Sequence, residues 1–257
     1  MIEQNFENFL DLGSSKLRLG VFDKKLFKLK YISEKNCITN LSLKKLDINN
    51  SQSIISELVR EAEKNINSHI KDLNLIIDTT NITTIAISLK KNFDEKLIDK
   101  EDINYFIIEA QRLIKSNHPD KKILHTIIDK YIFDDIEYDT FPEKNNLGKK
   151  IVLQLKFICI PKLIFEEIIS KFKENLIEIK KIYISSYVKS FNYSKFFERY
   201  NYKTFIDIGY NKSCLTIFKK KKLFLIKNIP IGGNHITKDI SKILEIPYEE
   251  AEEVKRS

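Results

Sequence analysis

The sequence is poor in the residues that build disulfide scaffolds and metal sites. It has 3 cysteines, 6 glycines, 5 prolines and no tryptophan among its 257 residues. The three cysteines are far apart and odd in number, and neither they nor the four histidines show the spacing of metal ligands. This excludes a disulfide framework and a zinc-ligand motif, and it predicts a reduced, cytoplasmic protein.

Arginine is scarce although the chain is basic. The formal net charge is +8 and the pI is about 9.1, but only Arg18, Arg60, Arg112, Arg199 and Arg256 are arginines; the other basic residues are lysines. Proteins that read nucleic acids favour arginine for bidentate contacts to bases and phosphates. The charge therefore predicts a solvated lysine surface and no specific nucleic-acid partner.

Long hydrophobic runs are also missing. No uninterrupted apolar stretch approaches the roughly 20 residues that a membrane-spanning helix needs. The first nine residues, MIEQNFENF, are acidic and lack the apolar core of a signal peptide. We expect neither a spanning helix nor a secretory leader in this sequence.

An internal repeat is the most informative feature that is present. FLDLGSSKLRLGVF (residues 9–22) and FIDIGYNKSCLTIF (residues 205–218) align without a gap. Asp11 then matches Asp207, Gly13 matches Gly209, and each stretch has the pattern of a strand, a tight turn and a second strand. One repeat at a large separation predicts two similar lobes rather than a solenoid.

Each repeated turn has the chemistry of a phosphate-binding loop. Glycine permits positive φ and a close approach of backbone to ligand, and successive turn N–H groups form an anion-binding nest. An aspartate at the strand end can reach Mg²⁺ through water molecules, because that ion keeps much of its hydration shell. Two facing hairpins would hold nucleotide phosphates from both sides; the alternative is a pair of ordinary hairpins.

Apolar periodicity divides the rest of the chain. It predicts helices over residues 51–70, 99–115 and 161–175 and from Pro247 onward, strands over 26–38, 73–89, 123–139 and 151–160, a loop over 141–150, and a strand followed by a helix within 177–197. Asp99 or Asp102 is the expected N-cap of the second helix. The run Lys219–Lys222 is the expected tip of a hairpin.

The C-terminal quarter carries a specific resemblance. IPIGGNHITKDISKIL (residues 229–244) followed by PYEEAEEVK (residues 247–255) resembles the FtsA family of bacterial division proteins. DKEDINYFIIEAQRLI and ILHTIIDKYIFDD resemble that family's inserted 1C subdomain of SHS2 type. The resemblance implies an α/β fold of the actin/Hsp70/sugar-kinase superfamily with an inserted α+β subdomain and an incomplete second lobe. The implied domains are a first lobe (1–83 and 168–200), the insert (84–167) and part of a second lobe (201–257).

The resemblance also implies ATP and Mg²⁺ as cofactors. The residues that it and the repeat assign to the phosphates are Asp11, Gly13, Ser14, Ser15, Lys16, Asp207, Gly209, Lys212, Gly232 and Gly233. Asp11 and Asp207 are the expected Mg²⁺ residues, through water. The second turn departs from the family's Gly-Gly-Thr, since Tyr210, Asn211 and Lys212 stand there. We therefore expect weak nucleotide binding and, at most, weak ATPase activity.

The function that the resemblance implies is mechanical rather than catalytic. It is to link FtsZ filaments to the cytoplasmic membrane and to recruit later division proteins, with self-association and a peripheral position on the cytoplasmic face at the division site. We expect this chain to keep contacts made by the insert, but not to hold FtsZ to membranes alone. The alternatives are another actin-fold assembly protein such as a pilus-assembly relative, a degenerate member without nucleotide binding, and a small-molecule kinase.

Overall fold

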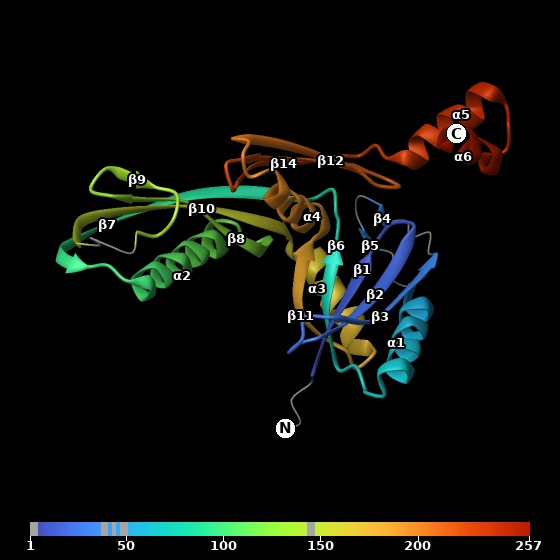
Figure 1. Cartoon of the computed structure of the whole chain (residues 1–257), viewed down its shortest axis with the longest axis horizontal. Coiled ribbons are helices and arrows are strands. Elements are labelled where there is room, and N and C mark those ends of the chain that lie inside the picture. The colour runs from blue at the N-terminus through green and yellow to red at the C-terminus, as the bar shows by residue number, and fades with distance from the viewer. Residues whose placement is uncertain (1–4, 37–40, 43–44, 47–50, 143–146) are drawn as a thin grey trace. The chain divides into compact units, whose positions relative to one another are not determined.

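The chain folds into two compact units. The computed structural model describes residues 5–36, 41–42, 45–46, 51–142 and 147–257. The larger unit combines Met1–Asn81 with Glu166–Ser257, and the smaller unit is Ile82–Phe165 (Figure 1). Cys37 and residues 143–146 of the predicted loop lie outside the described residues.

A five-stranded mixed sheet forms the first part of the larger unit. Its spatial order is β11 (Glu178–Ile184), β6 (Asp72–Ile77), β1 (Phe6–Leu12), β2 (Lys16–Asp23) and β3 (Leu29–Asn36). The pairs β1–β2 and β2–β3 are antiparallel, whereas β6 pairs parallel with both β1 and β11. Parallel pairing aligns the carboxyl ends of β1, β6 and β11 along one edge of the sheet.

Helices cover this sheet through apolar stripes. Helix α1 (Gln52–Ile66) packs on β2 and β3 and buries Ile55, Leu58, Val59 and Ala62, as its helical periodicity predicts. Leu10, Leu17 and Leu19 of the β1–β2 hairpin are completely buried. Helix α3 (Lys162–Glu174) follows β10 of the smaller unit and enters the larger one. The short strands β4 (Leu41–Ser42) and β5 (Lys45–Leu46) pair with each other.

A three-stranded antiparallel sheet forms the second part of the larger unit. Its order is β12 (Tyr202–Ile208), β13 (Ser213–Lys219) and β14 (Lys222–Ile229), so Lys219–Lys222 forms the hairpin tip that the sequence predicts. Helix α4 (Ser185–Ser194) packs on one face, where Phe218 lies between Tyr187 and Phe191 with ring centroids 6.5 and 6.3 Å away. The 3₁₀ turn η2 (Lys195–Phe197) follows α4. Helices α5 (Gly233–Leu244) and α6 (Tyr248–Arg256) pack on each other beyond β14.

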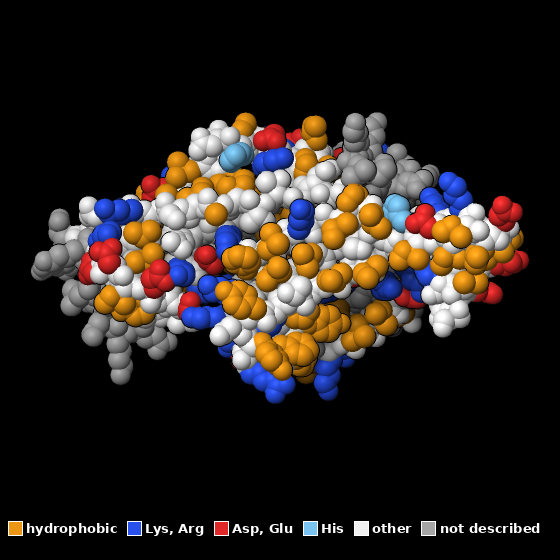
Figure 2. Space-filling model, turned by 90° about the horizontal axis from the view of Figure 1, so that it is seen from above, with side chains coloured by type: hydrophobic (Ala, Val, Ile, Leu, Met, Phe, Trp, Pro, Cys, Tyr) orange, Lys and Arg blue, Asp and Glu red, His pale blue; other side chains and the backbone are white. Residues whose placement is uncertain are grey.

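The opposite face of the β12–β14 sheet is apolar and exposed. Strand alternation puts Ile206 and Ile208 of β12 on this face together with Leu225 and Ile229 of β14. The two β12 isoleucines are 63% and 64% exposed. Figure 2 looks onto this sheet and shows hydrophobic side chains gathered over it.

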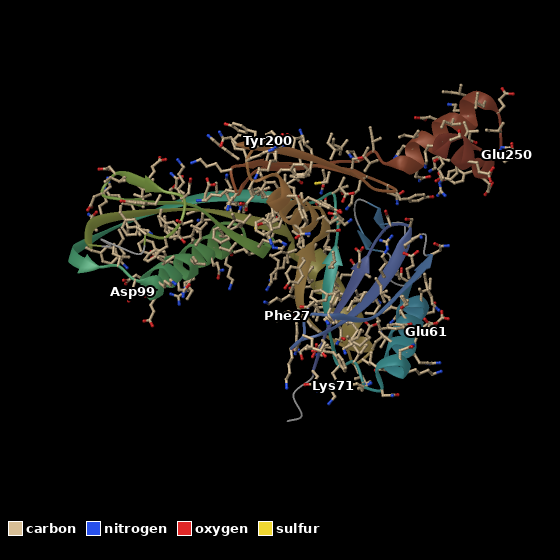
Figure 3. All side chains as sticks on the ribbon, in the orientation of Figure 1. Phe27, Glu61, Lys71, Asp99, Tyr200 and Glu250 are labelled. Carbon is tan, nitrogen blue, oxygen red and sulfur yellow. The ribbon has the colours of Figure 1, made fainter. Side chains whose placement is uncertain are left out.

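The smaller unit is an antiparallel sheet covered by one helix. The strand order is β7 (Thr83–Leu97), β10 (Leu147–Pro161), β8 (Lys121–Phe133) and β9 (Ile136–Tyr138), and α2 (Lys100–Asn117) packs on one face. Its core includes Phe106, Ala110, Leu153 and Phe157. Asp99, labelled in Figure 3 at the start of α2, accepts hydrogen bonds from the N–H groups of Glu101 and Asp102 at 2.8 and 2.9 Å.

Three predicted elements differ from the structure. The single strand predicted over 123–139 is a hairpin of β8 and β9, with a turn at Asp134 and Asp135. The single strand predicted over 73–89 is two strands, because residues 78–82 leave the first sheet and lead into the smaller unit. The loop predicted over 141–150 is shorter than expected, since β10 begins at Leu147 and pairs with β7 from that residue. None of the helices within the described ranges is long and apolar enough to span a membrane.

Candidate phosphate-binding site

A pocket lies where the parallel strands of the larger unit end. Leu12, Ile77 and Ile184 are paired neighbours at the carboxyl ends of β1, β6 and β11. The residues that follow these strands, Gly13, Asp78 and Ser185, all line a pocket of about 310 Å³. In open α/β sheets the carboxyl ends of the strands are the usual place for ligands.

Both repeated turns contribute to this pocket. The full set of lining residues is Asp11, Leu12, Gly13, Ser14, Ser15, Arg18, Asp78, Ser185, Lys189, Asp207, Ile208, Gly209, Tyr210, Asn211, Lys212, Ser213 and Cys214. The two hairpins pair in the same register, with Leu12 opposite Leu17 and Ile208 opposite Ser213. The internal repeat of the sequence is therefore also a structural repeat around one site.

The repeated glycines serve close backbone packing and not a left-handed turn. A Cβ on Gly13 would lie 2.6 Å from the carbonyl oxygen of Lys16, and one on Gly209 would lie 3.0 Å from that of Lys212. Neither glycine has a positive φ, so the expected use of that conformation is wrong. The turn instead closes by a hydrogen bond in which the Gly209 N–H donates to the Lys212 carbonyl at 2.9 Å.

Three of the ten predicted phosphate residues do not line the pocket. Seven do: Asp11, Gly13, Ser14, Ser15, Asp207, Gly209 and Lys212. Lys16 turns to the neighbouring strand, where its Nζ lies 2.6 Å from Oε1 of Glu34. Gly232 and Gly233 lie behind the second turn and hold it in place.

The start of α5 is bonded to the second turn. The N–H groups of Gly233 and Asn234 donate to the carbonyls of Gly209 and Tyr210 at 2.9 and 2.8 Å. Gly232 fits closely against the turn, because a Cβ on Gly232 would lie 2.5–2.6 Å from three backbone atoms of the turn. The first N–H groups of a helix need partners, and here the turn supplies them.

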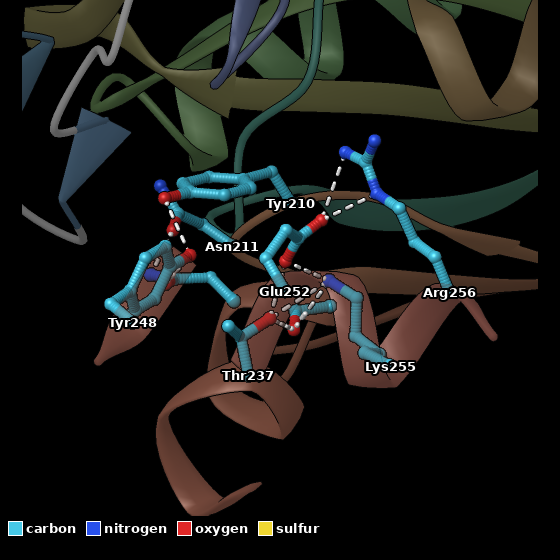
Figure 4. A network of polar contacts seen from close by, with 9 residues as sticks. Tyr210, Asn211, Thr237, Tyr248, Glu252, Lys255 and Arg256 are labelled. Carbon is cyan, nitrogen blue, oxygen red and sulfur yellow. Dashed lines mark hydrogen bonds and ion pairs between the residues drawn. The ribbon is translucent and has the colours of Figure 1, made fainter. Parts of the chain in front are cut away.

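A side-chain network extends this junction to α6 (Figure 4). The Tyr248 hydroxyl donates to Oδ1 of Asn234 at 2.8 Å, and Tyr210 donates to the Tyr248 hydroxyl at 3.0 Å. That bond is the main reason that the pKa of Tyr210 rises to about 12. The Asn234 amide donates to Oδ1 of Asn211 at 3.2 Å. Tyr210, which departs from the family's Gly-Gly-Thr, therefore has its hydroxyl bonded to α6.

Thr237 connects α5 to α6 in the same region. Its fully buried hydroxyl donates to Oε2 of Glu252 at 2.6 Å and accepts from Nζ of Lys255 at 2.8 Å. The hydrogen bond from Lys255 is the largest cause that lowers the pKa of Glu252 to about 2, followed by the bond from Thr237. The Gly232 N–H donates to Nδ1 of His235 at 3.2 Å. Thr237 and His235 therefore have structural bonds at the start of α5.

Three charged residues of the pocket were not predicted from the sequence. Arg18 Nη1 lies 3.4 Å from Oδ2 of Asp11, and Lys189 Nζ lies 3.3 Å from Oδ2 of Asp207. Asp78 accepts a hydrogen bond from Ser186 at 3.1 Å. The sequence did contain one signal for Asp78. It is a charged residue directly after the apolar stretch LNLII, where a buried strand ends.

Burial controls the ionisation of the pocket. It raises the pKa of Asp11, against the opposing charges of Lys189 and Arg18, and it raises that of Asp78 against the charge of Lys212. Burial also lowers the pKa of Lys212, although the charges of Asp78 and Asp207 act in the opposite direction. Burial thus disfavours the charged forms of these three groups, and the opposite charges nearby offset part of that effect.

The pocket fits a phosphate chain better than a metal ion. It offers the Ser14 and Ser15 hydroxyls, two glycine turns and three basic side chains. Both aspartates predicted to reach Mg²⁺ already have a basic partner, so they fit that ion poorly. No group of three or more His, Cys, Asp or Glu side chains in the described part of the chain is arranged to hold a metal.

Sequence comparison finds relatives that are named as cell division proteins. A family model described as "Cell division protein FtsA" matches residues 204–257. The chain is 22% identical over 260 residues to "Cell division protein FtsA" of Streptococcus pneumoniae serotype 2, strain D39, covering 99% of this chain. It is 26% identical over 258 residues to the protein of that name from Bacillus subtilis strain 168, covering 96% of this chain. In both cases it spans 56% of the relative's length.

Structure comparison agrees on the fold. The "PilM-PilN type IV pilus biogenesis complex" superposes with a TM-score of 0.65 at 13% sequence identity, covering 98% of this chain and 69% of that one. At this identity the similarity concerns the fold alone. The actin-like fold class that the family resemblance implies is confirmed. The chain is thus similar over nearly its whole length to proteins named "Cell division protein FtsA", and its C-terminal part matches the family model of that description.

Proposed function

We propose that this chain forms the nucleotide-responsive part of a division protein that links FtsZ filaments to the cytoplasmic face of the membrane and recruits later division proteins. The observation that carries the proposal is the match over nearly the whole chain to two proteins named "Cell division protein FtsA". The whole relatives are longer, so tethering and recruitment are properties of the complete protein.

Within that role the pocket binds the phosphates of ATP, and the nucleotide acts as a conformational ligand. Support comes from the two repeated turns that line one pocket at the carboxyl ends of the parallel strands. Asp11 and Asp207 each have an oxygen beside a basic side chain, so that oxygen is not free to accept a proton from an attacking water. Hydrolysis is therefore weak at most.

Assembly is the second part of the proposed role. The exposed apolar face of β12–β14 supports self-association, because contiguous apolar surface of this kind usually marks an interaction site. The smaller unit, with its own core of Phe106, Leu153 and Phe157, supports the contacts to neighbouring subunits and division partners that the family resemblance implies.

Depletion of the protein in its source organism tests this proposal. We expect the cells to elongate without septa while FtsZ loses its membrane-attached ring, and a plasmid-borne wild-type gene to restore division. Normal septation after depletion would contradict the division role. Normal septation together with a loss of surface pili would instead favour the pilus-assembly alternative. The fold similarity to the pilus complex is not by itself an argument for that alternative.

A further inference from the structure

The charges that line the phosphate pocket are balanced within the protein. Three carboxylates, Asp11, Asp78 and Asp207, face three basic side chains, Arg18, Lys189 and Lys212. A site that depends on Mg²⁺ needs carboxylates whose oxygens are available to the ion or to its waters. Here Asp11 lies 3.4 Å from Arg18 and Asp207 lies 3.3 Å from Lys189, so both already have a cation beside them.

Those two ion pairs leave N–H groups of Arg18 and Lys189 available to a ligand. The side chains of Arg18 and Lys189 are 44% and 51% exposed, and ion pairs at such exposure contribute about 0–1 kcal/mol. Phosphate oxygens are better partners for a guanidinium or an ammonium, because each group can accept several charge-assisted hydrogen bonds. Arg18 also holds Glu34 through Nε at 3.0 Å. A guanidinium has five N–H donors and an ammonium three, so both side chains can bind phosphate with their remaining N–H groups while each stays beside its aspartate.

Lys212 is the third cation and belongs to the second repeated turn itself. Its backbone carbonyl closes the turn by accepting from the Gly209 N–H, and its side chain lines the pocket. Its side chain makes no hydrogen bond or ion pair with another described residue, and Asp78 is the carboxylate that acts most strongly on its pKa. Lys16, its counterpart in the first hairpin, is held outside the pocket by Glu34 at 2.6 Å.

We propose that the pocket binds the polyphosphate chain of its ligand with Arg18, Lys189 and Lys212, and that it does so without a divalent metal ion. The inference rests on the nucleotide binding proposed above and concerns the charge partner of the phosphates. The three cations supply charge-assisted hydrogen bonds to the phosphate oxygens, which a bound metal would otherwise coordinate. Lys212 is the residue that makes this possible, because it stands in the turn where the family pattern has a threonine.

Calorimetric titration of the full chain tests the proposal with two probes. ATP and inorganic tripolyphosphate are each titrated in EDTA and in excess Mg²⁺. We expect ATP to bind weakly and about equally well in both conditions, within about threefold. Tripolyphosphate, which has no base or sugar, shows how much of the binding is due to the phosphate chain alone.

Two matched variants identify the residue. Lys212→Met keeps an unbranched side chain only one atom shorter and removes its charge, and it should weaken binding in EDTA about tenfold or more. Lys16→Met makes the same change in the first hairpin outside the pocket, and it should change binding less than about twofold. If Lys212→Met proves unstable in circular dichroism, Lys189→Met makes the same test on the neighbouring cation.

The outcomes separate this inference from the nucleotide proposal. ATP binding that appears only with Mg²⁺ would overturn the inference and leave the nucleotide proposal intact. Equal binding by wild type and Lys212→Met in EDTA would also overturn it. If neither probe binds in either condition, nucleotide binding fails and the inference fails with it.

Discussion

Replacement of Gly232 by alanine is the sharpest test of how the second turn is held. A Cβ there would lie 2.5 Å from the carbonyl oxygen of Gly209, 2.5 Å from the amide nitrogen of Lys212 and 2.6 Å from the carbonyl oxygen of Tyr210. These are backbone atoms, so no side chain can rotate away. Since Gly232 has φ −140°, a conformation open to alanine, the whole effect is steric.

The expected cost follows from the packing and the bonds at this junction. Overpacking of this kind costs about 1–3 kcal/mol. A shifted turn also loses the bonds from Gly233 and Asn234 to the carbonyls of Gly209 and Tyr210, each worth about 1 kcal/mol net. At about 2–4 °C per kcal/mol for a unit of this size, this total of about 3–5 kcal/mol should lower the midpoint of the larger unit by about 6–20 °C.

Gly233→Ala is the matched control. Its Cβ would meet Nζ of Lys255 at 3.4 Å and the Gly209 carbonyl oxygen at 3.8 Å, which are ordinary contacts. Alanine is also the better helix former by up to about 1 kcal/mol, so this variant should be neutral or slightly stabilised. Amide exchange in α5, read by mass spectrometry, is the appropriate assay because two units need not unfold as one. Equal protection of α5 in the two variants would refute the packing argument.

Three further predictions concern other parts of the molecule. The pKa of Glu252 is lowered to about 2, so its contribution to stability is present above the unfolded value of 4.5 and is lost as the pH falls toward 2. Exchange protection of α6 should fall over that range in the wild type, and Glu252→Gln should remove this dependence. Asp99→Ala removes the side-chain acceptor of the α2 capping box and should cost about 0.5–2 kcal/mol, seen as faster exchange in the first turn of α2. Ile206→Lys should lower the fluorescence of a bound hydrophobic dye, whereas Leu163→Lys, at a residue 80% exposed in α3, should not. Each prediction has its own contrary result. These are α6 protection that does not depend on pH in the wild type, an unchanged exchange rate in Asp99→Ala, and unchanged dye fluorescence in Ile206→Lys.

Local patterns in the sequence were sufficient for the elements that depend on neighbours in the chain. The repeat predicted two hairpins, and both are present in the same register. The apolar stripe predicted α1, and the acidic pair predicted the cap of α2, where Asp99 is the N-cap and Asp102 completes the capping box. In each case the determining contacts span only a few residues.

The charged part of the pocket depends on contacts that the sequence does not show. Asp78 reaches the site because β6 pairs parallel with β1, and Lys189 reaches Asp207 from α4. Both placements follow from the order of strands and from a helix packing on the second sheet. Sequence spacing carries no signal for such partners, since the residues of each pair are brought together only by the fold.

The two repeated lysines show why an exact alignment still misplaced one side chain. In the first hairpin Arg18 pairs across the strands with Glu34 of β3, and this carboxylate also binds Lys16. In the second hairpin the corresponding position of β14, opposite Cys214, is Asn228, whose amide donates to the Thr79 carbonyl. An amide has no charge to hold an ammonium, so Lys212 keeps its position in the pocket. The difference between the two turns therefore arises on the third strand of each sheet, outside the repeat itself, and it is this strand that decides which lysine can meet a phosphate.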